Sequence, residues 1–96
     1  MYMRMSLACL KPGMGDAWRR MVDGYDPLIR QIPGFVAVTY YCDDGAGLAG
    51  SLSVWQSKEA AEAAATRIDD KTHEVMASMY QGVPTVQVLQ VYEPVR

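Results

Sequence analysis

The chain contains a single histidine, His73, which is the side chain best suited to proton transfer near neutral pH. An imidazole in this position could act as a general base on an acidic substrate. Helical periodicity places His73 at the edge of an apolar stripe, beside Asp69 and Tyr80. The same position also suits a surface histidine paired with Asp69 or Asp70. The sequence leaves both interpretations open.

Arg4 and two adjacent tyrosines are further candidates for binding a ligand. Arg4 interrupts a strand-like run that is otherwise uncharged, and a guanidinium group binds anions well. The alternative is an ion pair across a subunit interface, for example with Glu93. Tyr40 and Tyr41 fall on opposite faces of another strand-like run, so one hydroxyl is expected in a pocket and the other at an interface. Their alternation does not say which is which.

Composition argues against several other classes of protein. The chain has no Ser-His-Asp arrangement, no glycine-rich phosphate loop and no cluster of metal ligands. Its 96 residues predict one domain, 1–96, and the net charge of −2 argues against a nucleic-acid binder. No membrane-spanning run and no signal peptide are visible, so we expect a cytoplasmic protein.

Four strand-like runs and two helical runs must position the candidate residues. Strand-like runs alternate between two faces or are apolar on both, and helical runs repeat apolar residues every three or four positions. The predicted elements are a strand over 2–10, a helix over 14–32, strands over 35–42 and 48–55, a helix that begins at the cap Ser57 and stops before Gly82, and a strand over 85–93. This order predicts an α+β, ferredoxin-like βαββαβ sandwich with a four-stranded antiparallel sheet.

Several positions are expected to shape these elements locally. Pro27 should kink the first helix, or restart it with Asp26 as a cap. The two aspartates at 69–70 could interrupt the second helix and begin a new helical piece. Strict alternation along the second strand places Phe35 on the face opposite Tyr40.

The expected sheet leaves one apolar face uncovered. Right-handed crossovers put both helices on the same side of the sheet. The opposite face keeps apolar residues from every strand, and Arg4 and Glu93 are the only charges within the clear strand runs. Because soluble monomers rarely expose such a face, we predict a homodimer that packs sheet against sheet, with a hetero-partner as the alternative.

Three segments resemble the antibiotic biosynthesis monooxygenase (ABM) family, a branch of the dimeric α/β barrels. They are Ile32-Pro33-Gly34-Phe35, Ser53-Val54-Trp55-Gln56-Ser57-Lys58-Glu59-Ala60 and Val91-Tyr92-Glu93. The resemblance covers essentially the whole chain. It implies a single ferredoxin-like domain that pairs into a dimeric α/β barrel, with a pocket between the sheet and the helices of each subunit.

The resemblance further implies a cofactor-independent monooxygenase acting on a small aromatic phenol, a quinol or a polyketide-like substrate. Trp55 matches the tryptophan that lines the pocket of the anthrone oxygenases in this family. Those enzymes carry asparagine where this chain has Ser51, and tyrosine where it has Ala61. We predict His73 and Trp55 as catalytic residues, with no metal and no cofactor. The predicted substrate-binding residues are Arg4, Trp18, Tyr40, Ser51 and Tyr80.

The same resemblance implies two alternatives. Haem-degrading members place an iron-ligating histidine at nearly the spacing of His73 after Trp55, so haem is the alternative cofactor. Those members also use an asparagine, a residue absent from this chain, and a second tryptophan where it has Ala64. Other members have no known activity, which leaves a non-catalytic ligand-binding dimer as the second alternative.

Overall fold

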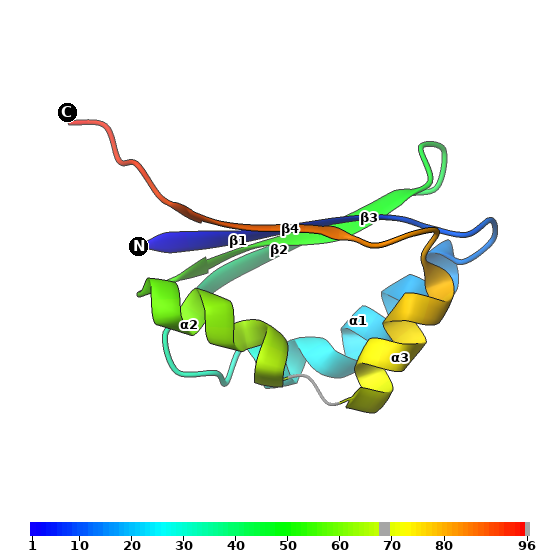
Figure 1. Cartoon of the computed structure of the whole chain (residues 1–96), viewed down its shortest axis with the longest axis horizontal. Coiled ribbons are helices and arrows are strands. Elements are labelled where there is room, and N and C mark those ends of the chain that lie inside the picture. The colour runs from blue at the N-terminus through cyan, green and yellow to red at the C-terminus, as the bar shows by residue number, and fades with distance from the viewer. Residues whose placement is uncertain (68–69, 96) are drawn as a thin grey trace.

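The computed structural model of the chain describes residues 1–67 and 70–95. It consists of one layer of β-sheet with helices on one side only (Figure 1). The elements, in chain order, are β1 (Tyr2–Cys9), α1 (Gly15–Ile29), β2 (Phe35–Asp43), β3 (Leu48–Trp55), α2 (Lys58–Ala63), the 3-10 turn η1 (Ala64–Arg67), α3 (Asp70–Met79) and β4 (Thr85–Gln90).

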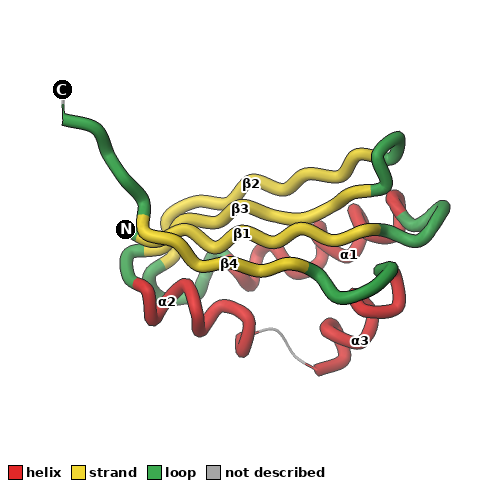
Figure 2. Tube along the Cα trace, turned by 45° about the horizontal axis from the view of Figure 1, so that its top comes forward, coloured by secondary structure: helices red, strands yellow, loops and turns green. Residues whose placement is uncertain are grey.

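The sheet is four-stranded and antiparallel, with the strand order β2-β3-β1-β4 (Figure 2). The two central strands are β3 and β1, which are paired on both sides. The predicted ferredoxin-like βαββαβ sandwich is therefore confirmed. Side chains that stand on β1 and β3 toward the helices lie under the centre of the helical layer.

The first helix continues through its proline and ends earlier than predicted. Pro27 lies inside α1, so the predicted restart with Asp26 as a cap is wrong. Because Pro27 is in the last turn, few helical hydrogen bonds follow it. The N–H groups of Gln31 and Ile32 donate to carbonyls three residues earlier, at 3.2 and 3.1 Å, and this tighter turn ends the helix at Ile29.

The last strand is also shorter than predicted, ending at Gln90 rather than at residue 93. Gln90 pairs with Tyr2, the first residue of β1, and the N–H of Val91 donates to the Met1 carbonyl at 2.9 Å. Beyond Val91 the chain runs past the start of β1. The ladder stops there because β1 offers no further residue with which to pair.

The second helical region consists of three pieces. Ser57 Oγ accepts a hydrogen bond from the N–H of Ala60 at 3.1 Å, so the predicted cap of α2 is confirmed. The chain then tightens into η1, and α3 begins at Asp70. The predicted interruption at 69–70 falls partly outside the described residues, and a new helix does begin at its second position.

A β-bulge in β2 changes the face on which Phe35 lies. Phe35 pairs with Trp55 while Ala37 pairs with Val54, and the register shifts between these two pairs. The extra residue puts Phe35 on the same, helix-covered face as Tyr40, so the prediction of opposite faces is wrong. The Phe35 and Trp55 rings meet edge to face, with their centroids 5.6 Å apart.

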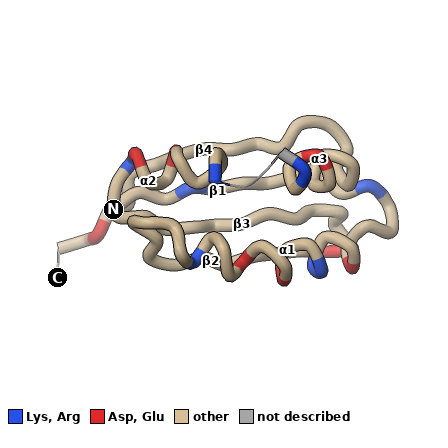
Figure 3. The backbone as a smooth tube through the Cα atoms, turned by 90° about the horizontal axis from the view of Figure 1, so that it is seen from below, with Lys and Arg blue, Asp and Glu red and all other residues tan. Residues whose placement is uncertain are grey.

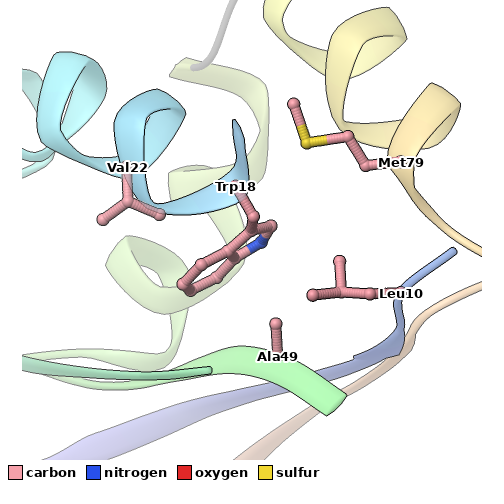
Figure 4. Packing of buried hydrophobic residues seen from close by; sticks show 5 residues of the cluster. All are labelled: Leu10, Trp18, Val22, Ala49 and Met79. Atoms are coloured by element: carbon pink, nitrogen blue, oxygen red, sulfur yellow. The ribbon is translucent and has the colours of Figure 1, made fainter. Parts of the chain in front are cut away.

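Two clusters of buried apolar side chains lie between the sheet and the helices. Ala49 belongs to the first and Trp55 to the second, and these residues stand near opposite ends of β3. The clusters are therefore separated along the strand. The first contains Leu10, Trp18, Val22, Ala49 and Met79 (Figure 4), and the second contains Ile29, Trp55, Ala61 and Ala64.

The opposite face of the sheet is uncovered and apolar. Met5, Leu7, Leu52 and Leu89 point away from the helices, and these residues are 37–42% exposed. Charged residues gather on the helices and loops instead (Figure 3). Among the described residues, no helix has the length and apolar character needed to cross a membrane.

Candidate functional site

A cavity of about 530 Å³ lies between the sheet and the helices. Its floor is formed by β1, β2 and β3, its opposite wall by α1, η1 and α3, and one side by the chain that leads into β4. The volume is in the range of pockets that bind small organic molecules. Most of the lining is apolar, and its polar members are Arg4, Ser6, Tyr25, Tyr40, Ser51, Ser53, His73 and Tyr80.

The structure brings most of the predicted site residues together around this cavity. They come from β1, β2, β3 and α3 and from the turn after α3, so they converge only when the sheet and helices pack. Those that line the cavity are Arg4, Tyr40, Ser51, Trp55, His73 and Tyr80.

Trp18 is the exception, because it lies in the first core cluster and is only 3% exposed. In place of the direct ligand contact that we predicted, its Nε1 donates to Tyr80 Oη at 3.2 Å. Since the Tyr80 hydroxyl accepts this bond, its own proton remains available to a ligand. Burial raises the pKa of Tyr80, so the hydroxyl keeps that proton near neutral pH.

Trp55 forms an apolar wall of the cavity at 1% exposure. Its Nε1 donates to Ser53 Oγ at 2.8 Å, and Ser53 Oγ in turn donates to the Arg4 carbonyl at 3.4 Å. The indole N–H is therefore already engaged within the protein. At this exposure the ring is covered by its neighbours, so Trp55 shapes the wall of the cavity and has no free donor to offer.

Ser51 forms a pair with Ser6, a residue that our sequence analysis did not select. The two Oγ atoms are 3.1 Å apart, and the Ser51 N–H also donates to Ser6 Oγ at 3.1 Å. Ser6 stands directly opposite Ser51 in the ladder between β1 and β3. Because it falls on the same strand face as Arg4, alternation could have identified it.

Tyr40, and not Tyr41, supplies the pocket hydroxyl of β2. Tyr40 Oη donates to Asp26 Oδ1 at 2.7 Å, and Asp26 Oδ2 accepts from Arg30 Nε at 2.8 Å. Burial and this hydrogen bond raise the pKa of Tyr40. Its proton is held by Asp26, so toward the cavity the Tyr40 oxygen can only accept. Tyr41 lies on the uncovered face, where its hydroxyl donates to the Ser6 carbonyl.

Tyr25 also faces the cavity from α1, although our sequence analysis did not select it. Its ring meets Tyr40 edge to face, with the centroids 6.1 Å apart. Burial, together with the neighbouring Tyr80, raises the pKa of Tyr25 to about 12, and the charge of Arg4 opposes this rise. Tyr25 therefore stays neutral beside Arg4. The only signal in the sequence was a tyrosine among aliphatic stripe positions, which is common in cores.

His73 lies at the exposed rim of the cavity on α3. Its Nε2 is 2.9 Å from the carbonyl oxygen of Ala65. A carbonyl can only accept, so Nε2 carries a proton and Nδ1 of the neutral ring is left as an acceptor. The predicted pairing with the carboxylates at 69–70 falls outside the described side chains.

These contacts do not fit a haem-iron ligand. With Nε2 bound to Ala65, only Nδ1 of His73 could ligate, and this atom lies next to the chain attachment, where a flat macrocycle would meet the helix. Across residues 1–67 and 70–95, no group of three or more His, Cys, Asp or Glu side chains is placed to hold a metal ion. Binding haem through His73 would first require the contact with Ala65 to break.

Comparisons of structure identify the fold. A structure described as an antibiotic biosynthesis monooxygenase matches with a TM-score of 0.79 and 14% identity, covering 97% of this chain and 100% of the other. The chain has the fold of the antibiotic biosynthesis monooxygenases. No protein-family model matches it, and no curated protein matches it in sequence.

Two further ABM-like structures come from Streptomyces. A monooxygenase from Streptomyces coelicolor in complex with nanaomycin D matches with a TM-score of 0.73 and 16% identity, covering 99% of this chain and 90% of the other. SnoaB, a cofactor-independent oxygenase from Streptomyces nogalater, matches with a TM-score of 0.78 and 11% identity, covering 98% and 95%. At such identities the similarity establishes the ABM fold, and the activity must be argued from the site.

Proposed function

We propose that this ABM-fold protein is a cofactor-independent monooxygenase acting on a small aromatic phenol, quinol or polyketide-like substrate. The observation that carries the proposal is the cavity of about 530 Å³, whose apolar walls hold Arg4 and several hydroxyl groups. Apolar walls suit aromatic rings, and a few polar groups can orient ring oxygens. The Streptomyces neighbours, described as a monooxygenase and a cofactor-independent oxygenase, support the same chemistry.

In the proposed reaction a CH₂ group flanked by aromatic rings becomes a carbonyl. The ionised substrate passes an electron to dioxygen, and the two radicals combine into a hydroperoxide. Its O–O bond then breaks, so one oxygen atom stays as the carbonyl and the other leaves as water. The substrate supplies all four electrons, and no further reductant is needed.

The residues of the cavity divide this work between them. Because Nε2 of His73 faces the Ala65 carbonyl, Nδ1 is the ring atom that can act as a base at the rim, where the proton can reach water. Arg4 and the Tyr80 hydroxyl are the donors that can stabilise negative charge on the ring oxygens. Trp55, which is buried beside the cavity, fixes the shape of its apolar wall.

We also propose that two copies pack sheet to sheet. The uncovered face carries Met5, Leu7, Leu52 and Leu89, each exposed by 37–42%. Burying this much apolar surface favours association, and two sheets can pack face to face. A second copy presents the same apolar surface, so a twofold pair covers both faces at once.

Oxygen uptake with a panel of anthrones and quinols tests the proposed activity. Ala77 is exposed on α3 and lines the cavity, so Ala77→Trp should narrow the cavity without disturbing the core, and uptake should fall at least about tenfold. Val75, on the same helix, is 40% exposed and does not line the cavity, so Val75→Trp is the matched control. Equal uptake by both variants would show that the reaction does not use this cavity.

A non-catalytic ligand-binding dimer is the second candidate. Ala61 is fully buried at 0% exposure, and the Ser51 and Trp55 side chains already bond to Ser6 and Ser53. These contacts leave fewer free donors than an oxygenase would use. Tight binding of an aromatic phenol without any oxygen uptake across the panel would favour this candidate.

A further inference from the structure

Arg4 is the only permanently charged side chain among the described residues that line the cavity. It stands on the central strand β1, opposite Ser53 on one side and Val88 on the other. Its side chain is therefore fixed beneath the helices, not at an edge of the sheet. A charged ligand inside the cavity interacts electrostatically with Arg4, and such interactions are strong where water is excluded.

The Arg4 guanidinium has no ion pair or hydrogen bond with any described residue, in contrast to Arg19 on α1 and Arg30 just after α1. Arg19 lies 3.2 Å from Asp44, and Arg30 lies 2.8 Å from Asp26. Burial lowers the pKa of Arg4, as expected when a cation loses water without gaining a counter-charge. A partly buried cation in this state favours an anion that enters the cavity.

The hydrogen bonds of two tyrosines decide which further polar groups of the lining can bind a ligand. Tyr80 Oη accepts from Trp18, so its proton can be donated into the cavity that Arg4 also lines. Tyr40 Oη donates to Asp26, so its oxygen accepts from a ligand. The lining therefore suits a ring system that carries one anionic oxygen and one hydroxyl group.

We propose that the cavity selects its aromatic ligand as an anion, with the charge of an ionised phenol or enol resting against Arg4. This inference rests on the proposed function and specifies its substrate class: acidic phenols and enols, in preference to neutral ethers of the same shape. The phenol releases its proton to water on binding, and no other bond changes in this step. The ionised form is also the one that the proposed reaction requires.

Binding of two naphthoquinones in the absence of oxygen tests this inference. Lawsone has one acidic hydroxyl, and its methyl ether has the same ring system without the charge. Wild-type protein should bind lawsone at least about tenfold more tightly than the ether. Arg4→Met keeps an unbranched stem but removes the charged group, so it should weaken the affinity for lawsone by about 10- to 100-fold and change the affinity for the ether by less than about twofold. Arg4→Lys keeps the charge and should retain most of the preference.

A second readout uses wild-type protein alone, in case Arg4→Met does not fold. The visible absorbance of bound lawsone, followed against pH, should show that binding lowers the pKa of its hydroxyl. Equal affinity for the two quinones, a raised pKa in the complex, or no binding of either at millimolar concentration would each overturn the inference. Oxygen uptake with phenols but no preference for the anion would refute anion selection and leave the proposed oxygenase activity intact. Preference for the anion without oxygen uptake would support anion selection and contradict the proposed oxygenase activity.

Discussion

Replacing Tyr40 by phenylalanine should lower the free energy of unfolding by about 1–2 kcal/mol. A hydrogen bond to a charged group contributes about 1.5–3 kcal/mol, and Tyr40 Oη lies 2.7 Å from Asp26 Oδ1. The Asp26 side chain is 25% exposed and Arg30 is 53% exposed, so water reduces the contribution of this network. Asp26→Asn should lower the free energy of unfolding by a similar amount. The double variant should lose less than the sum of the two single losses, with a coupling energy of about 1 kcal/mol.

The contribution of Asp26 should also depend on pH. Its hydrogen bonds with Arg30, the larger cause, and with Tyr40 hold its pKa below the usual range, although burial acts in the opposite direction. A carboxyl group with a lowered pKa stabilises the fold fully above the pKa of the unfolded chain, about 3.9. That stabilisation is lost as the pH falls through the lower folded-state pKa. The effect of Asp26→Asn should therefore be largest near neutral pH and shrink below about pH 4.

Urea denaturation of the wild type, the two single variants and the double variant, at about pH 7 and about pH 3, measures both effects. Tyr41→Phe is the matched control, because its hydroxyl bonds the Ser6 carbonyl on the uncovered face. Its effect should simply add to that of Asp26→Asn. Additive effects for Tyr40→Phe and Asp26→Asn, or an effect of Asp26→Asn that does not change with pH, would refute this reasoning.

Three further predictions concern the interface, the core and the rim. Leu52 lies on the uncovered face at 37% exposure, so Leu52→Lys should convert the proposed dimer to monomer in ultracentrifugation, whereas Leu28→Lys, at 64% exposure on α1, should not. A Leu52→Lys protein that remains dimeric would contradict the proposed interface. Trp55→Phe should lower the free energy of unfolding by about 2 kcal/mol in urea, because a cavity forms and Ser53 Oγ loses its donor; an unchanged midpoint would mean that this contact contributes nothing. The Soret spectrum after adding haem should be the same for the wild type and His73→Ala. A Soret band that is present in the wild type and absent from His73→Ala would support the haem alternative.

Strand periodicity correctly predicts which face of the sheet each β1 side chain lies on, and so it predicts much of the candidate site. Alternation places Arg4 and Met5 on opposite faces of the strand, and they lie on the cavity and on the uncovered face respectively. Period-two alternation is enforced by backbone geometry, so it holds wherever the ladder is regular. It failed in β2 at Phe35, where a bulge adds one residue. No turn residue lies within this bulge, so it could not be predicted from residue types alone.

Contacts between distant segments were the part that could not be predicted. Asp26 was considered only as a helix cap, yet it binds Tyr40 from the neighbouring layer at 2.7 Å. Tyr80 and Trp18 are 62 positions apart and meet through one hydrogen bond. Periodicity assigns a residue to a face but does not say which side chain lies across the interior. The direction in which each tyrosine proton points therefore became clear only from the packed structure.

The product formed from a dihydroxyanthrone under isotopically labelled dioxygen tests the central claim most directly. Purified protein without added metal, flavin or nicotinamide should form the quinone at least about tenfold faster than Ala77→Trp, with one labelled oxygen atom in the new carbonyl. A rate equal to that of Ala77→Trp, or a product whose new oxygen is unlabelled, would contradict oxygenation within this cavity.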